Sequence, residues 1–363
     1  TPAGVAGGDD AGGKDAEGSE GGAKSMGTAG SEGAGEGPAD AAGAAGAAGA
    51  PLEPTCMYTE QHDTTNMRAV PIETGFAEDT QLVLADGELV FCGTIDPGHF
   101  ASNSDTVDVD SFSIDVTGAT EILVKAEFAE PSPSGSLHIA ATPAGGTDRR
   151  TTAASGRAAL WRPVSTQLIN VSAVMRATAA LAEPIPYVIR VRADDVEARC
   201  PKLAAGDATA TYAESNDGDG TKNDTVEVGA VVGEQAPTAD ATDAPEPTGI
   251  ALDLGTKVLI SGSSASVGSN IGYRDIDTFA LNPGSASLLT FRIDWAGEVD
   301  FDLYLFHAND YKERGTTFEN VNPDMLSLAA DASSTWWLLA GLGSVNTSQL
   351  PKAYTISICN EAF

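Results

Sequence analysis

Two five-residue stretches, Asp108-Val109-Asp110-Ser111-Phe112 and Asp275-Ile276-Asp277-Thr278-Phe279, decide the fold because each is a near copy of the other. A second pair, Pro186-Tyr187-Val188-Ile189 and Ala353-Tyr354-Thr355-Ile356, follows at the same offset of 167 residues. Two matches at one offset over about 80 residues indicate an internal duplication, with one structural unit in each half of the chain.

The duplication extends toward the start of each half, where Tyr58–Asp63 parallels Tyr212–Asp217. We therefore predict two related domains, residues 56–200 (the first copy) and residues 207–363 (the second copy). The acidic, proline-bearing run 235–247 is expected to form a loop inserted in the second copy.

Residues 1–55 have a different composition from the rest of the chain. They contain 16 glycines and 15 alanines, no aromatic residue, and nine acidic against two basic side chains. Such a segment cannot bury enough apolar surface to offset the entropy lost on ordering. We predict a disordered, acidic Gly/Ala-rich tether.

After residue 55 the sequence changes to short alternating runs rich in Val, Ile, Thr and Phe, separated by Gly, Pro, Asn and Asp. This pattern is typical of an all-β sandwich, and we predict two tandem β-sandwich, jelly-roll-like domains. The predicted strands are 81–85, 89–92, 109–116, 121–128, 136–142, 186–193, 257–261, 277–281, 288–295, 300–307, 335–339 and 353–359. The stretch 167–181 fits a helix or a strand, and its pattern does not decide between them.

The charge of the chain excludes two classes of partner. It has 52 acidic and 20 basic side chains, which give a net charge of −32. Nucleic acids and anionic lipid surfaces are polyanions that such a chain repels, so neither is an expected partner. No run of about 18 apolar residues is present, and we therefore expect no transmembrane segment.

The four cysteines contain no C-x-x-C pair, which argues against a zinc or redox site. We predict two disulfides, Cys56–Cys92 and Cys200–Cys359, because the cysteine near the front of each repeat, Cys56 or Cys200, then pairs inside that repeat. The competing pairing, Cys56–Cys200 with Cys92–Cys359, would join the copies. Disulfides indicate an oxidising compartment, so we expect an extracellular or cell-surface protein. The chain begins at Thr1, and with this tether we expect a removed signal peptide or a lipid anchor.

The order of motifs in the second copy resembles the pre-peptidase C-terminal domain family. It runs from Tyr-x-Glu-x-Asn-Asp at 212–217 through Asp-x-Asp-x-Phe at 275–279 to Trp295, the strand 299–305 and the terminal 353–356. The resemblance implies small β-sandwiches that are appended to secreted bacterial proteases and collagenases or occur in surface proteins without an enzyme.

The first copy resembles a diverged member of the same family. It keeps the Asp-x-Asp-x-Phe pattern, but His62 replaces Asn216, and Ser136–Ala140 stands where the second copy has its Asp-Phe-Asp-Leu-Tyr run.

Acidic and amide side chains of the second copy are candidate calcium ligands, because calcium takes several hard oxygen donors. In relatives of the pre-peptidase domain, the Glu-x-Asn-Asp segment and a downstream Asp can hold calcium. The predicted ligands are Glu214, Asn216, Asp217, Asp219, Asp275 and Asp277. The alternative is a solvated acidic turn capped by its own side chains. Whether the first copy binds calcium stays open.

Alternation along 299–307 directs Phe301, Leu303 and Leu305 inward and Asp302, Tyr304 and Phe306 to the other face. The same rule places both carboxylates of Asp275–Phe279 on one face together with the phenyl ring. We expect that face to point outward, with a bend or bulge after Asp277 that turns Phe279 inward.

Trp336 and Trp337 are adjacent in a predicted strand, so one faces in and the other faces out. The outward ring, taken as Trp337, could join Tyr304, Phe306 and Tyr311 in an aromatic platform for a sugar or an extended peptide. The alternative is ordinary apolar cover at a sandwich edge.

No catalytic motif is visible. The four histidines, at 62, 99, 138 and 307, have no recognisable nucleophile beside them, and no Gly-x-Ser-x-Gly, His-Glu-x-x-His or phosphate loop occurs. We predict a non-catalytic binding or adhesion protein whose partner is an extracellular polysaccharide or protein. The alternatives are an oligomeric structural subunit of an envelope or extracellular assembly, and the accessory C-terminal region of a secreted hydrolase.

Overall fold

The structure is a computed structural model, and it describes part of the chain. The described residues are 55–61, 77–85, 87–95, 106–129, 135–146, 149–153, 155–177, 183–214, 246–264, 276–297, 299–307, 312–316, 322–332, 335–342 and 352–363. The predicted tether, apart from Thr55, lies outside them, as do Asn216, Asp217, Asp219, Asp275 and Tyr311.

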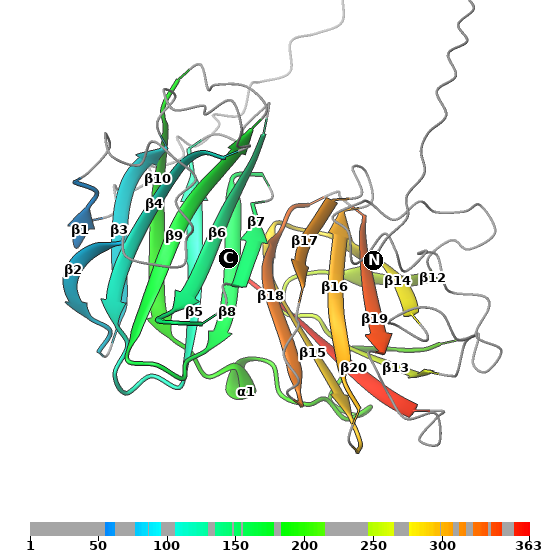
Figure 1. Cartoon of the computed structure of the whole chain (residues 1–363). Coiled ribbons are helices and arrows are strands. Elements are labelled where there is room, and N and C mark those ends of the chain that lie inside the picture. Colours follow the sequence, from blue (N-terminus) through cyan, green and yellow to red (C-terminus); the bar gives the residue numbers. More distant parts are fainter. Residues whose placement is uncertain are drawn as a thin grey trace, which may run out of the picture. The chain divides into compact units, whose positions relative to one another are not determined.

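Within these ranges the chain forms twenty strands and one short helix, α1 (Val196–Arg199), which confirms the all-β prediction (Figure 1). The strands of the first copy are β1 (Tyr58–Thr59), β2 (Glu78–Val83), β3 (Glu88–Ile95), β4 (Thr106–Asp115), β5 (Glu121–Phe128), β6 (Gly135–Pro143), β7 (Arg149–Thr152), β8 (Arg157–Pro163), β9 (Leu168–Ala177) and β10 (Ile185–Ala193). Within the stretch that fitted helix or strand, residues 168–177 form strand β9. None of the helices in the described part is long and apolar enough to cross a membrane.

The second copy repeats this arrangement. Its strands are β11 (Ala210–Ala213), β12 (Glu246–Leu252), β13 (Lys257–Ser264), β14 (Ile276–Pro283), β15 (Ser287–Trp295), β16 (Phe301–His307), β17 (Lys312–Thr316), β18 (Asp324–Ala330), β19 (Trp336–Leu342) and β20 (Lys352–Glu361). The first copy has two five-stranded sheets in the orders β1-β3-β10-β5-β8 and β2-β4-β9-β6-β7. The second has β11-β13-β20-β15-β18 and β12-β14-β19-β16-β17, so adding ten to every label converts one copy into the other.

Alternating side chains from the two sheets of each copy fill its core. In β4, Phe112 and Ile114 are buried, whereas Ser113 and Asp115 between and after them face away from the core. The Phe112 ring stacks on Phe91 of the facing sheet with centroids 5.1 Å apart. The second copy has a matching apolar cluster that includes Phe279, Phe301, Leu303 and Leu305. The predicted inward face of 299–307 is therefore confirmed.

The predicted bend after Asp277 is wrong. Strand β14 pairs with β19 without a register shift from Ile276 to Leu281. Asp277 and Phe279 both point into the sandwich, with 2% and 0% of their surface exposed. Phe279 enters the apolar core, and Asp277, two residues earlier on the same face, is buried because it receives a hydrogen bond from Tyr354.

Both predicted disulfides are present. Cys56 bonds Cys92, and Cys200 bonds Cys359, with Cα–Cα distances of 5.7 and 5.6 Å. Cys200 directly follows α1, in the segment that joins the copies, and Cys359 lies in β20. The second disulfide therefore attaches the connecting segment to the sheet of the second copy.

Residues 53–363 form one compact unit, and an apolar junction within it joins the copies. The junction cluster contains Leu123, Ala159, Trp161, Val196, Leu288, Met325 and Ala329. At its polar side, the buried guanidinium of Arg199 lies 2.9 Å from Asp194 and donates to Ser327 Oγ at 3.2 Å. Strand β8 contacts its own counterpart β18, and β7 contacts β17. The two copies thus meet through equivalent edges.

Candidate functional site

A cluster of two carboxylates and a tyrosine lies in the second copy. The Tyr354 hydroxyl donates to Asp277 Oδ2 at 2.6 Å, and Glu214 Oε2 accepts from the Ser263 amide at 2.9 Å. A Cβ at Gly262 would lie 2.3 Å from the tyrosine Oη and 2.8 Å from Glu214 Oε2. Only glycine allows these groups to approach the strand so closely.

The first copy has the same cluster, built from the corresponding residues. Glu60 Oε2 accepts from the Thr94 amide at 3.0 Å. A Cβ at Gly93 would lie 2.2 Å from Tyr187 Oη and 2.7 Å from Glu60 Oε2, which matches the crowding at the second-copy glycine. The cluster is therefore part of the duplicated scaffold.

The first-copy cluster holds one carboxyl group in its neutral form. Burial, followed by repulsion from Asp108 and by the proximity of Glu60, raises the pKa of Asp110 to about 10. Burial and the neighbouring Asp110 raise the pKa of the Tyr187 hydroxyl well above its usual value. At neutral pH Asp110 is therefore protonated, and a protonated carboxyl is a poor cation ligand.

The structure brings together only part of the predicted calcium site. Glu214 and Asp277 both contribute to the second-copy cluster, while Asn216, Asp217, Asp219 and Asp275 lie outside the described residues. Within the described ranges, no three His, Cys, Asp or Glu side chains are grouped so that they could hold a metal ion. Calcium takes six to eight oxygen ligands, so these two carboxylates alone do not fit it.

The predicted exposure of Tyr304 and Trp337 is wrong. Their exposed fractions are 1% and 8%, and Phe306 on the same face is 2% exposed. Rings covered to this extent cannot offer a stacking surface to a ligand. Tyr311, the remaining predicted member of the platform, lies outside the described residues.

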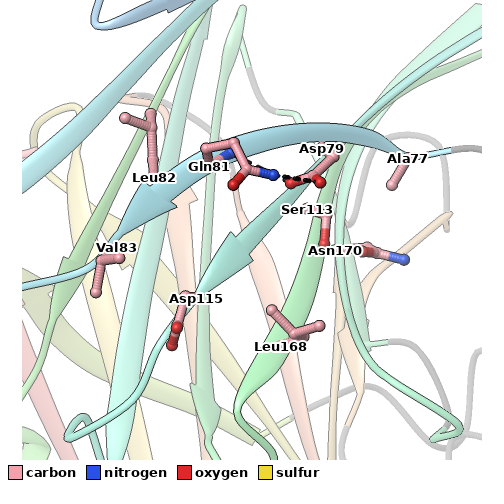
Figure 2. A pocket seen from close by; sticks show the side chains of 9 residues that line it. All are labelled: Ala77, Asp79, Gln81, Leu82, Val83, Ser113, Asp115, Leu168 and Asn170. Carbon is pink, nitrogen blue, oxygen red and sulfur yellow. Dashed lines mark hydrogen bonds between the residues drawn. The ribbon is translucent and has the colours of Figure 1, made fainter.

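An open cavity lies instead on the first copy, over the outer face of the sheet that contains β2, β4 and β9. Its volume is about 530 Å³, within the usual range for small-molecule sites. Figure 2 shows the lining side chains on these three strands. They are Ala77, Asp79, Gln81, Leu82, Val83, Ser113, Asp115, Leu168 and Asn170.

The floor of this cavity consists of two cross-strand pairs, Ser113 with Asn170 and Asp115 with Leu168. These residues face outward because the residues alternating with them, such as Ile114 and Ile169, fill the core. Asp115 Oδ1 accepts from the Thr117 amide at 2.8 Å, and Oδ2 accepts from Gln167 Nε2 at 3.2 Å. Hydrogen bonds from Thr117 and then Gln167 lower the pKa of Asp115, which is an anion at neutral pH.

The wall of the cavity is the bulged edge strand β2. Its pairing with β4 shifts register between Asp79 and Val83. Thr80 Oγ1 donates to the Ser113 carbonyl at 2.8 Å and fixes the bulge. Gln81 at its centre has φ of +56°, a left-handed conformation that is unusual for a residue other than glycine. Its side-chain amide donates to the Asp79 carboxylate, as Figure 2 shows.

The second copy has the same bulge but different residues around it. Gly249, with φ of +65°, holds the position of Gln81. The floor pair opposite it is Ala280 with Trp337, which places an indole where the first copy has Asn170. Asn282 and Thr335 hold the positions of Asp115 and Leu168 and bond to each other at 2.9 Å. The polar groups of Gln81, Ser113 and Asn170 are thus specific to the first copy, because Gly249, Ala280 and Trp337 hold their positions in the second.

Sequence reasoning missed this cavity because it concentrated on the better-preserved second copy. The sequence did contain a signal, because Gln81 aligns with Gly249. A glycine can mark a backbone conformation with positive φ, and the other copy must adopt the same conformation at that position. Asn170 and Trp337 are 167 residues apart, so they align as well, and the difference between them can be read from the sequence.

Comparisons with known proteins give a distant likeness of fold. No family model matches the chain, and no curated protein matches it. Among solved structures, the pre-peptidase C-terminal domain of collagenase from Bacillus anthracis is 15% identical, with a TM-score of 0.23, and the match covers 32% of this chain and 96% of that domain. The extracellular domain of ANXUR2 from Arabidopsis thaliana is 10% identical, with a TM-score of 0.20 and coverage of 78% and 90%. The CUB1-EGF-CUB2 domains of rat MASP-1 are 13% identical, with a TM-score of 0.17 and coverage of 74% and 97%. Likenesses at this level assign neither ligand nor activity.

Proposed function

We propose that this chain is a non-catalytic extracellular binding protein whose ligand enters the cavity of the first copy. The observation that carries the proposal is the difference between two copies of one scaffold. Both keep the bulged edge strand, but only the first surrounds it with Gln81, Ser113, Asp115 and Asn170. The second copy then serves as a structural partner, joined to the first through their common junction.

The disulfides support an extracellular location. Two disulfides involve all four cysteines of the chain. Such bonds persist in oxidising compartments and are rare in the cytosol. A leader peptide or a lipid anchor is part of this proposal.

The chemistry of the cavity supports binding over catalysis. The titratable groups that line it are Asp79 and Asp115. Asp115 is held as an anion by neighbouring hydrogen bonds, so it is unsuited to donate a proton at neutral pH. The cavity lining contains amides, a hydroxyl and aliphatic groups that can hold a ligand without transforming it.

Calcium binding by the second copy is a separate proposal. It is supported by the proximity of Glu214 and Asp277, which both lie near the Tyr354 hydroxyl. The oxygen-rich sequence that follows Glu214 in the chain also supports it. Calcium would supply charge neutralisation and rigidity there. It takes no part in ligand binding by the first copy.

The proposed function is tested by measuring binding of the full chain to immobilised extracellular polysaccharides and matrix proteins. Asn170→Trp fills the cavity with the residue that the second copy uses at the same position. We expect at least one surface to bind, and this variant to weaken binding at least about tenfold, which corresponds to about 1.4 kcal/mol. Asn282→Ala, at the equivalent floor of the second copy, is the matched control and should leave binding unchanged. Binding that Asn170→Trp does not alter would contradict the proposal.

A further inference from the structure

We propose that the cavity of the first copy binds a neutral glycan. This inference rests on the proposed function and adds the chemical class of the ligand. It follows from three properties of the cavity lining: its mixture of hydrogen-bond donors and acceptors, its aliphatic surface and the sign of its charges.

The polar groups of the lining require a ligand that both donates and accepts hydrogen bonds. Asp79 and Asp115 are acceptors, whereas Gln81, Asn170 and Ser113 carry both kinds of group. A ligand hydroxyl can donate to a carboxylate and accept from an amide at the same time. Lysine and arginine side chains only donate, and they would leave the amide N–H groups of Asn170 unmatched. Vicinal hydroxyls therefore fit the lining better than a basic peptide does.

The apolar part of the lining suits the C–H face of a sugar ring. Val83 and Leu168 are 53% and 46% exposed, although both are large aliphatic residues. Leu168 lies directly across the strand pair from Asp115, so an apolar surface adjoins a hydrogen-bonding group on the floor. A pyranose has the same division, with C–H groups on its faces and hydroxyls around its edge. Burial of the ring would remove these aliphatic groups from water.

The charges favour a neutral ligand. Of the described residues that line the cavity, two are acidic and none is basic. The chain as a whole carries a net charge of −32. An anionic glycan would meet repulsion both locally and over the whole surface, so uronic acids and sulfated sugars are disfavoured.

The topology favours recognition by side chains over addition of a peptide strand. Strands β4 and β9 form the floor, and each is already paired on both sides, β4 with β2 and β9, and β9 with β4 and β6. Their backbone groups are used within the sheet and cannot pair with a peptide in the cavity. Strand addition needs an unpaired sheet edge. The edge strand at this cavity is β2, and its register shift between Asp79 and Val83 interrupts the regular pairing that an added strand would need.

The side chain of Gln81 bonds to Asp79 within the bulge, but the backbone conformation at this position does not require a glutamine. Its left-handed backbone is strained for a residue other than glycine. The second copy avoids that strain with Gly249 at the same position. A residue with a strained backbone is expected where its side chain takes part in binding. We therefore assign Gln81 as the residue that fixes the orientation of the sugar hydroxyls.

The test is calorimetric titration of the full chain with defined probes. The neutral probes are linear oligosaccharides of glucose, mannose, xylose and N-acetylglucosamine; oligogalacturonate is the anionic probe and oligolysine the basic one. We expect one neutral series to bind, and Gln81→Gly and Asn170→Trp each to weaken it at least tenfold. Gln81→Gly should fold with nearly the stability of the parent, which separates loss of binding from loss of structure. Asn282→Ala should bind like the parent.

The outcomes separate this inference from the proposed function. If no neutral oligosaccharide binds, the glycan assignment is overturned. If oligolysine or a matrix protein binds instead and Asn170→Trp abolishes that binding, the cavity is a site for another ligand class, and only the glycan assignment fails. If a neutral oligosaccharide binds equally well to both cavity variants, the site lies elsewhere, and both proposals fail.

Discussion

Gln81 of the first copy and Gly249 of the second hold the same position in a bulged edge strand and share a left-handed backbone, with φ of 56° and 65°. In both copies the preceding threonine donates to the adjacent strand, Thr80 to the Ser113 carbonyl and Thr248 to the Ala280 carbonyl. The bulge is therefore fixed by the scaffold. The residue at its centre can therefore differ between the copies without loss of the bulge.

Exchange of these two residues should have unequal effects on stability. A Cβ at Gly249 would meet no atom within 4 Å, so Gly249→Gln should cost only backbone strain, about 1–2 kcal/mol of unfolding free energy. Gln81→Gly should lie within about 1 kcal/mol of the parent, because relief of strain offsets the greater unfolded-state entropy of glycine. Urea unfolding measures both. A larger loss from Gln81→Gly than from Gly249→Gln would contradict this account of the bulge.

Asp110 should make the protein less stable as the pH rises. Its folded pKa of about 10 lies above the unfolded value of 3.8. Its contribution to stability is therefore fully present below about pH 4 and is lost as the pH rises toward 10, with a slope of at most about 1.4 kcal/mol per pH unit. Asparagine cannot ionise, so Asp110→Asn removes this pH dependence. The free energy of unfolding of the variant should therefore rise relative to that of the parent between pH 5 and pH 8.

Asp115→Asn is the control for the Asp110 experiment, because its pKa shift has the opposite sign. Hydrogen bonds lower the pKa of Asp115, so its favourable contribution is present above the unfolded pKa and is lost as the pH falls. Urea unfolding at several pH values compares the two variants. A stability difference between Asp110→Asn and the parent that does not vary with pH would show that Asp110 is ionised in the folded protein.

Removal of the Cys200–Cys359 bond should destabilise the protein more than removal of Cys56–Cys92. The two bonds span 159 and 36 residues. Removal of a native disulfide usually lowers the free energy of unfolding by about 2–5 kcal/mol. Because loop-closure entropy grows with loop length, the loss should be about 1 kcal/mol larger for the Cys200–Cys359 bond. Paired Cys→Ala variants in thermal unfolding make the comparison. The reverse order of melting temperatures would contradict it.

Calcium should raise the melting temperature if the second copy binds it. The predicted ligands carry several carboxylates, whose repulsion a bound cation relieves. Asp217→Ala should remove the rise, whereas Asp115→Ala in the first copy should retain it. Differential scanning calorimetry with millimolar calcium, and with magnesium as the comparison ion, measures the effect. No shift in the parent at millimolar calcium would remove the calcium proposal.

The sequence predicted the fold because period-two alternation survives wherever one strand face is buried. Strand β5 covers exactly the predicted residues 121–128, and most other predicted strands differ at their ends by one to three residues. The strands that were not predicted all lie at sheet edges: β1, β7, β8, β11, β12, β17 and β18. In β18 every residue is buried, so its sequence shows no alternation to detect.

The candidate site was harder to predict because burial and exposure depend on what covers each face. Alternation put Tyr304 correctly on the face opposite the core, but it could not show that this face is also covered. It also put Asp277 beside Phe279, and charge suggested that the carboxylate faces outward, with a bend that turns the phenyl ring inward. The hydrogen bond from Tyr354, which lies 77 residues away, reverses that expectation. Contacts across such separations have no local signature.

The junction between the copies has a consequence for how the protein assembles. Ala159 in β8 and Met325 in β18 occupy equivalent registers and lie in one apolar cluster, so the same edge of each copy faces its counterpart. Two free subunits that met in this way would form a twofold dimer. Joining them end to end makes their pairing independent of protein concentration, so dilution cannot separate them. A fragment that carried one copy alone would expose this apolar edge to solvent. Two such fragments would be expected to dimerise through it.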